Sequence, residues 1–99
     1  MNKQEYNGWT NYETWNVHLW ITGNDQGTYD YWREQTELCL DTPGEILDAT
    51  YALSVALKAE HIDNIPETLK GVYADLLGAA LSEVNWTEIA QSLIDEVTE

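Results

Sequence analysis

The sequence predicts an all-α protein: a compact bundle of about five helices in a single domain. Apolar side chains recur every three or four residues in five stretches, and no stretch shows the sustained alternation of a strand. Three of these stretches begin with the spacing of a capping box, in which Glu follows a capping side chain by three residues. A chain of 99 residues has room for one hydrophobic core and no second domain.

The first helix is expected from about residue 11 to residue 22, after a frayed lead-in over residues 1–8. Thr10 and Glu13 match the capping box, and Gly23 is suited to end the helix. Apolar and aromatic side chains cover more than one face of this helix. We therefore expect its aromatic side chains to be the pivot on which the other four helices pack, with one or two rings left at the surface.

The second helix is expected from about residue 28 to residue 40, after a turn over residues 23–27 that is rich in Gly, Asn and Asp. Tyr29, Trp32 and Thr36 share one face of it. Because the turn is short, the first two helices are expected to be antiparallel neighbours.

The third helix is expected to begin with Thr42 as its cap and Pro43 at its first position, while Glu45 closes the capping box. It should extend to about His61, and several alanines favour the helix and close packing. Its apolar residues form one stripe and, beside it, a second stripe of Leu47, Tyr51 and Val55.

The fourth helix is expected to begin near Pro66, which a first turn tolerates and a helix interior does not, and to reach about Val84. The fifth is expected to follow a cap at Asn85, with Glu88 three residues later. The apolar residues of the fourth helix are spaced for a buried face made of Leu69, Val72, Tyr73, Leu76, Leu77, Ala80 and Leu81.

The chain carries 18 acidic residues against four Lys and Arg residues, a formal net charge of −14. This charge disfavours direct binding to nucleic acid or to an anionic membrane surface, and it favours a basic partner. A protein whose normal ligand is nucleic acid is such a partner. No apolar run approaches the ~18 residues of a membrane span and no leader precedes the first helix, so we expect a cytoplasmic location.

No residue pattern in the sequence predicts catalysis, a cofactor or a metal site. His18 and His61 stand on different helices and outside any metal-ligand spacing, so we expect solvated or hydrogen-bonded helix residues. Cys39 falls on an apolar stripe, where a free cysteine behaves as a small hydrophobic residue. Asn24 and Asp25 lie near glycines but do not fit a calcium loop. We therefore expect a protein that is not an enzyme.

Acidic side chains are concentrated around the two junctions that flank the third helix. On a helix, carboxylates three or four residues apart recur every ~5–6 Å, against one phosphate per ~3.4 Å along each DNA strand. Such a face imitates nucleic acid at reduced charge density. The competing interpretation is a solvated face with no partner. The candidate partner-binding residues are Glu34, Glu37, Asp41, Glu45, Asp48, Glu60, Asp63 and Glu67.

The large rings of this chain are five Trp and six Tyr with no Phe, so each carries a polar group that needs a partner or water. Such rings at helical spacing are more often core than binding site. The rings between residues 9 and 32 do not all fit into one core, so some are expected at a contact surface, where they act as anchors. The candidates are Trp9, Tyr12, Trp20 and Tyr31.

The run from Gly8 to Trp20 contains Gly-Trp-Thr-Asn-Tyr-Glu-Thr-Trp, and the loop Asn-Asp-Gln-Gly follows at residues 24–27. This pattern resembles the signature of uncharacterised small proteins carried by phages, plasmids and other mobile elements. The resemblance covers about the first third of the chain and implies no activity, cofactor or catalytic residue. It implies a genomic setting in which small acidic proteins block host restriction or CRISPR machinery.

We therefore predict a protein-binding inhibitor of a host nucleic-acid-binding defence system, of the anti-CRISPR or anti-restriction type. It would act in the host cytoplasm through acidic helix faces that imitate or block nucleic acid. Its expected partner is a host protein with a basic nucleic-acid-binding surface. The alternative is a mobile-element adapter or a homodimer that relies on exposed Trp and Tyr contacts. An enzyme is less favoured than either, because no set of titratable residues converges in the sequence.

Overall fold

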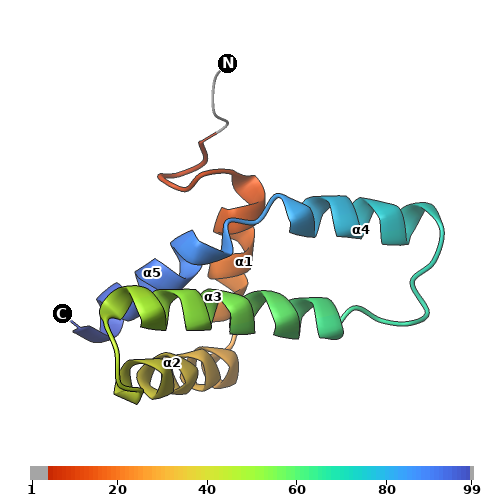
Figure 1. Ribbon diagram of the computed structural model, residues 1–99. Coiled ribbons are helices and arrows are strands. Elements are labelled where there is room, and N and C mark those ends of the chain that lie inside the picture. The colour runs from red at the N-terminus through yellow and green to blue at the C-terminus, as the bar shows by residue number, and fades with distance from the viewer. Residues whose placement is uncertain (1–4, 99) are drawn as a thin grey trace.

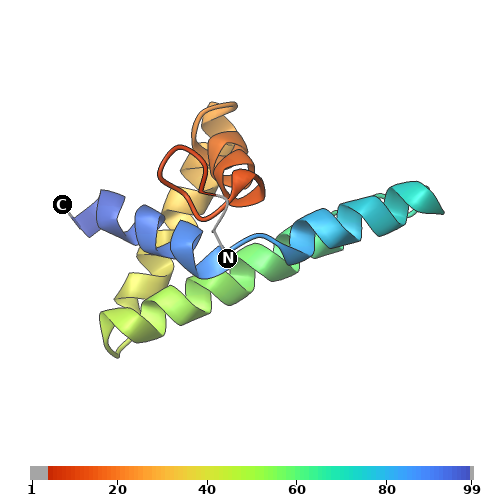
Figure 2. The same cartoon turned by 90° about the horizontal axis from the view of Figure 1, so that it is seen from above.

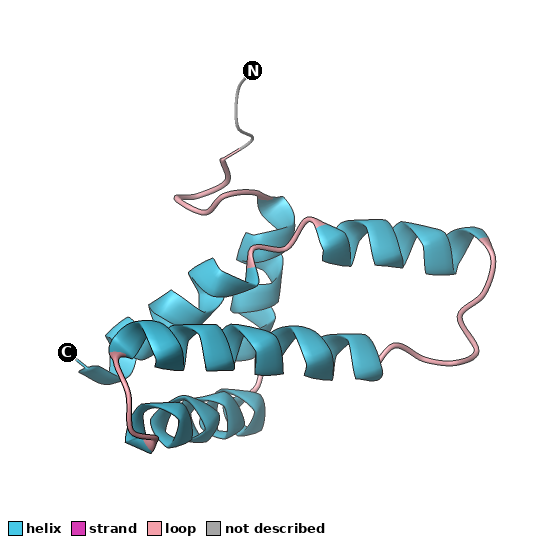
Figure 3. Cartoon of the chain, in the orientation of Figure 1, coloured by secondary structure: helices cyan, strands magenta, loops and turns pink. Residues whose placement is uncertain are grey.

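Five α-helices and their connecting loops make up the computed structural model, which describes residues 5–98 (Figures 1 and 3). Within these residues no β-strand forms, and the pairing of Tyr6 with Trp9 is an isolated bridge. The predicted all-α fold with five helices is confirmed. The helices are α1 (Tyr12–Thr22), α2 (Gln26–Asp41), α3 (Ile46–Asp63), α4 (Val72–Ser82) and α5 (Trp86–Thr98).

The hydrophobic core lies where α2, α3 and α5 meet. α3 and α5 make the most extensive helix contact, and α2 packs against both. Leu53 and Leu57 of α3 and Ile89 of α5 are completely buried, and Trp32 of α2 is buried beside them. Burying one such aliphatic side chain contributes roughly 1.5–3 kcal/mol. Figure 2 shows α2 and α5 gathered beside the first half of α3, with α4 beside the other half.

α1 packs against α2 and α5 at the edge of this core. Only Thr14 and Ile21 of α1 are buried, and the Trp20 side chain is 57% exposed. The prediction that the α1 aromatics are the pivot for the other four helices is therefore wrong. Spacing along a sequence measures how apolar each helix face is, but the centre of a bundle is decided by which faces meet.

The segment before α1 is folded into a tight turn. The backbone N–H groups of Tyr6 and Trp9 each donate to the other residue's carbonyl at 2.8 Å. Between them Gly8 has a φ of 89°, which glycine adopts without strain. The Tyr6 ring packs on Trp15 with 4.7 Å between ring centroids. The predicted frayed lead-in is wrong for this turn, and its first part, residues 1–4, lies outside the described residues.

The starts of α1 and α2 differ slightly from their predictions. Asn11, rather than Thr10, caps α1, because its Oδ1 accepts from the backbone N–H of Thr14 at 2.9 Å. α2 begins earlier than predicted because Asp25 caps it and accepts from the backbone N–H of Thr28 at 2.9 Å. Both caps satisfy N–H groups that have no partner inside their helix.

α3 begins later than predicted, at Ile46. Its capping box consists of Glu45 and Asp48, and the backbone N–H of Glu45 donates to the Asp48 carboxylate at 3.2 Å. The predicted cap at Thr42 and first helical position at Pro43 are therefore wrong. The capping-box pattern has Glu at the third position after the cap, whereas this chain has Asp48 there. The sequence pattern therefore did not predict this box.

α4 departs furthest from its prediction. It begins at Val72 rather than near Pro66, because residues 64–71 form a loop that ends at Gly71 with a φ of 68°. None of its residues is buried, so the predicted buried face is wrong. Tyr73, for example, is 68% exposed. Figures 1 and 2 show α4 running back alongside the second half of α3 in the opposite direction.

Candidate functional site

Three exposed carboxylates follow one another along one side of α2: Glu34, Glu37 and Asp41. Their spacing places neighbouring carboxylates roughly 4.5–6 Å apart along the helix axis. Glu37 has a cationic neighbour, Arg33 at 3.5 Å, and this is the one ion pair among residues 5–98. Both of its side chains are more than half exposed, so water and salt weaken it. This row of three residues is termed the α2 acidic stripe.

Tyr31 lies at the start of the α2 acidic stripe and connects it to α3. Its hydroxyl donates to the carboxylate of Glu60 at 2.7 Å. This hydrogen bond raises the pKa of Tyr31, burial raises it further, and the negative charges of Glu60 and Glu34 act in the same direction. The structure thus brings together Tyr31, Glu34 and Glu60, which were separate candidates in the sequence. These three residues are termed the Tyr31 cluster.

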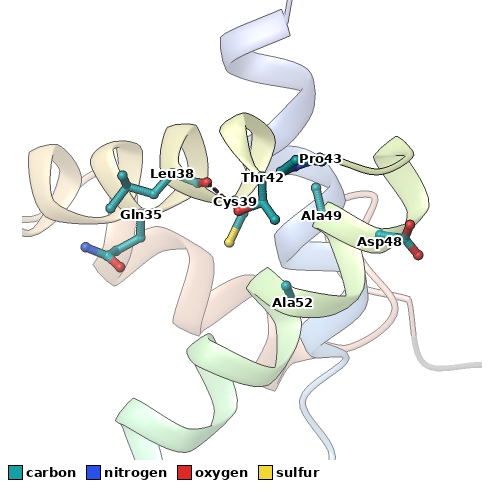
Figure 4. Close-up of a pocket in the computed structure, with 8 residues that line it drawn as sticks. All are labelled: Gln35, Leu38, Cys39, Thr42, Pro43, Asp48, Ala49 and Ala52. Atoms are coloured by element: carbon teal, nitrogen blue, oxygen red, sulfur yellow. Dashed lines mark hydrogen bonds between the residues drawn. The ribbon is translucent and has the colours of Figure 1, made fainter.

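A pocket of about 240 Å³ opens between the end of α2 and the start of α3 (Figure 4). Figure 4 shows Cys39 of α2 and Ala52 of α3 reaching into it from facing helices. Burial raises the pKa of the Cys39 thiol, so the thiol stays protonated at neutral pH. The space is mostly apolar and can accept the tip of an apolar side chain. Its lining consists of Gln35, Leu38, Cys39, Thr42, Pro43, Asp48, Ala49 and Ala52.

The eight acidic candidates do not form one surface. Glu45 and Asp48 lie at the start of α3, close in sequence to Asp41, and they also cap the helix. Asp63 ends α3, and Glu67 lies in the loop that follows. The 18 residues of α3 separate these groups by roughly 26 Å. We take the α2 acidic stripe and the Tyr31 cluster as the candidate site, because α2 and the hydrogen bond between Tyr31 and Glu60 place these residues next to one another.

The four aromatic candidates have different surroundings. Trp9 is half-buried, packs against the core and lies 4.4 Å from the His18 ring between centroids. Tyr12 is 50% exposed, and Trp20 is more exposed still. Tyr31 is 40% exposed and belongs to the acidic surface. Trp9 therefore packs against the core, while the other three rings are accessible to a partner.

The two histidines both take part in contacts between helices. His61 of α3 stacks on Trp32 of α2, and its Nδ1 lies 2.8 Å from the Leu57 carbonyl. His18 of α1 lies 3.4 Å from the hydroxyl of Ser92 on α5, and burial lowers the pKa of His18. Within residues 5–98, no group of three His, Cys, Asp or Glu side chains is placed to hold a metal ion.

The motif at residues 8–15, termed the α1 motif, is joined by its polar residues to the start of α5, a contact that the sequence did not predict. The hydroxyl of the fully buried Thr14 accepts from the backbone N–H of Asn85 at 2.8 Å. The Asn11 amide donates to the Glu83 carbonyl at 2.7 Å. Asn85 also caps α5 as predicted, accepting from the Glu88 N–H at 3.1 Å. The sequence feature that could have indicated this contact is the presence of small polar residues between the large aromatic ones.

A second missed feature is the apolar row on the outer side of α3, opposite the buried side that carries Leu53. Leu47 and Tyr51 are 73% and 72% exposed. Both stripes of the predicted third helix were visible in the sequence, and a helix that packs on one side buries only one of them. The row consists of Leu47, Tyr51, Val55 and Ile62 and is termed the α3 outer stripe.

None of the helices in residues 5–98 has the length and apolar composition of a membrane span. Searches of curated proteins and of solved structures return no significant match to this chain. A family model described as "Family of unknown function (DUF7249)" matches residues 2–99. Because that match covers nearly the whole chain, the protein belongs to the DUF7249 family.

Proposed function

We propose that this protein is an inhibitor that binds a host nucleic-acid-binding defence complex of the restriction or CRISPR type. The α2 acidic stripe, with the Tyr31 cluster beside it, occupies the basic groove in which that complex holds nucleic acid. The observation that carries the proposal is the exposed row of carboxylates on one helix, with a single weak ion pair among residues 5–98.

Electrostatics supply the attraction in this proposal. A net charge of −14 draws the chain toward a basic groove at long range and raises the association rate, and salt screens both effects. Tyr31 adds a ring that the hydrogen bond to Glu60 holds in place. Fixed aromatic rings at the centre of an interface commonly supply much of the binding energy.

The resemblance of the α1 motif to small proteins of mobile elements guides the choice of partner. Among proteins with basic nucleic-acid grooves, it favours the complexes that defend a host against such elements. The α1 motif itself has a structural part in the fold, through Asn11 and Thr14, so the proposal assigns the contact to α2 and not to the motif.

The test uses purified restriction enzymes and CRISPR effector complexes, whose binding to nucleic acid is measured with and without the chain. We expect the chain to compete with nucleic acid at low salt and to lose most of its affinity toward molar salt. The variant E34Q/E37Q/D41N should bind at least about tenfold more weakly, a change of about 1.4 kcal/mol.

The matched control is D75N/E83Q/D95N, which removes the same charge from exposed positions outside α2. It should keep most of the affinity, because screening limits the contribution of distant charges. Competition that does not change with salt, or an equal loss in the two triple variants, would contradict the proposal.

A second candidate function is an adapter of a mobile element that binds its partner through aromatic rings. The exposure of Tyr12 and Trp20, 50% and 57%, favours it. In that case W20A and Y12A weaken partner binding, whereas E34Q/E37Q/D41N leaves binding intact and salt has little effect.

A further inference from the structure

The pocket between the end of α2 and the start of α3 has room for one long side chain. It is lined by the eight residues that Figure 4 labels and is termed the α2–α3 pocket. Its volume of about 240 Å³ is below the ~300–1,000 Å³ of pockets that hold drug-sized ligands. Leu38, Pro43, Ala49 and Ala52 give it apolar walls. The aliphatic stem of a long side chain can therefore fill it.

The end of α2 beside this pocket lacks a backbone cap. The ends of α1, α3 and α4 each have a backbone N–H beyond the helix that donates to a carbonyl of the last turn. Among residues 5–98 no such bond closes α2, because the chain is extended at Thr42 and the following Pro43 has no N–H. The Thr42 hydroxyl donates to the Leu38 carbonyl at 3.2 Å. The carbonyls of residues 39–41 are left to accept from a ligand or from water.

The segment that forms the pocket carries only negative charge. Residues 34–57 contain no Lys, Arg or His. Their acidic side chains are all exposed and are those of Glu34, Glu37, Asp41, Glu45 and Asp48. The end of α2 adds the negative pole of a helix dipole, and its last turn has no basic residue. An apolar pocket with open carbonyls and this charge around it favours a cation with an aliphatic stem.

We propose that the α2–α3 pocket binds an arginine side chain of the partner. The aliphatic stem lies against the apolar walls, and the guanidinium donates to the open carbonyls at the end of α2. The negative charges of Asp41 and Asp48 attract it. Arginine suits the site better than lysine, because its planar group has five donors and is more weakly hydrated. An uncharged side chain would leave the carbonyls and the carboxylates without a partner.

The α2–α3 pocket lies at the end of the α2 acidic stripe, since Thr42 of its lining directly follows Asp41. Proteins that hold nucleic acid present arginines that bind its phosphates. In the proposed function the partner is such a protein, so one of its arginines enters the pocket while others face the stripe. The source of the arginine thus rests on the proposed function, whereas the affinity of the pocket for a guanidinium does not.

Titration of the full chain with propylguanidinium, an analogue of the arginine side chain, tests the pocket directly. Backbone amide chemical shifts should change around residues 38–52 and not in α4, with a dissociation constant in the millimolar range. Propylurea keeps the stem and the planar shape without the charge, and guanidinium keeps the charge without the stem. Each should bind at least about tenfold more weakly, because each lacks one of the two contacts.

Filling the pocket should remove this binding. A52F places a ring in the pocket from an exposed position, so it should weaken propylguanidinium binding at least about tenfold without disturbing the core. The matched control A79F adds the same ring at an exposed position of α4 and should leave binding unchanged.

Removing negative charge near the pocket should have a smaller effect. D41N/D48N keeps the shape of both side chains and should weaken propylguanidinium binding at least about threefold. D75N/D95N removes the same charge from exposed positions farther from the pocket and should have little effect, because salt screens distant charges.

Competition with nucleic acid for a defence complex separates the pocket from the inhibitor function. A52F should compete at least about tenfold more weakly than A79F. Equal binding of propylguanidinium and propylurea, or equal competition by A52F and A79F, would overturn the arginine pocket and leave the inhibitor proposal standing. A chain that does not compete with nucleic acid at all would overturn the inhibitor proposal and the source of the arginine, while the propylguanidinium titration still decides whether the pocket binds a guanidinium.

Discussion

α4 and α5 are consecutive helices of similar length, yet one lies on the surface and the other in the core. α5 buries Trp86, Ile89, Ala90, Leu93 and Ile94, and α4 buries no residue. The apolar residues of α5 share one face, and polar residues cover the other. α4 is apolar on most sides and has Asp75 as its one charged residue. Overall hydrophobicity is therefore a poorer guide to burial in this chain than segregation to one face.

The junction between α4 and α5 explains why the two helices lie in different parts of the structure. α5 is fixed at its start by Thr14, which accepts from the Asn85 N–H, and by Glu88, which accepts from the Thr10 N–H at 3.1 Å. Each of these bonds connects α5 to the α1 motif. α4 has its contacts with α1 at its end, near Leu81, and extends away from there. The motif thus anchors α5 and leaves α4 free along most of its length.

The largest effect should come from truncating matched apolar residues in the two helices. I89A in α5 removes a fully buried side chain and should reduce the free energy of unfolding by about 2–5 kcal/mol. L76A in α4 removes an exposed side chain and should change the free energy of unfolding by less than about 0.5 kcal/mol. Urea unfolding measures both, and equal losses would show that α4 is part of the core.

Removing a hydrogen bond of the α1 motif should have the next largest effect on the free energy of unfolding. T14V keeps the shape of a fully buried side chain and removes the acceptor of the Asn85 N–H, which should cost about 1–3 kcal/mol. T42V is the matched control, because the Thr42 hydroxyl is exposed and donates only to the Leu38 carbonyl at 3.2 Å. If the two variants unfold at the same denaturant concentration, the motif does not anchor α5.

The packing of His18 between α1 and α5 should produce a smaller, pH-dependent effect. Burial lowers the pKa of His18 from 6.5, and the charge of Glu96 opposes this shift only in part. The unfolded chain therefore binds the proton more readily than the folded chain. The resulting stability is fully present above about pH 6.5 and is lost as the pH falls through the lowered pKa of the folded state.

The measurement compares wild type with H18Q by thermal unfolding at several pH values. Wild type should lose more stability than H18Q between about pH 7 and pH 5, since the variant lacks this titration and keeps every carboxylate. Parallel curves for the two proteins would mean that His18 titrates equally in the folded and unfolded chain.

The smallest effect should come from helix propensity within α4. An added Cβ at Gly78 meets no heavy atom within 4 Å, so G78A should stabilise the helix by about 0.5–1 kcal/mol. Hydrogen exchange should slow in α4 and stay unchanged in α5, because α4 opens on its own. A79G at the adjacent exposed position should accelerate exchange in α4. A shift of the global unfolding midpoint in either variant would show that the two helices unfold together.

Much of the candidate site was accessible from the sequence because carboxylates stay in water unless they are paired. Glu34, Glu37 and Asp41 were therefore predicted on the surface, where they lie. The meeting of Tyr31 with Glu60 was not predictable, because the two residues are 29 positions apart and on different helices. The sequence predicted that Glu45 closes a capping box begun by Thr42, whereas in the structure Glu45 is the cap and Asp48 closes the box.

The sequence by itself determined that five helices form, because periodic apolar residues and capping side chains act within a few residues of one another. Most helix boundaries followed from the same local forces. Only the tertiary structure decided that α3 and α5 form the centre, that the α1 motif fastens α5, and that α4 and the outer side of α3 stay exposed. The physical reason is that burial depends on which surfaces meet, and one apolar stripe fits many surfaces equally well.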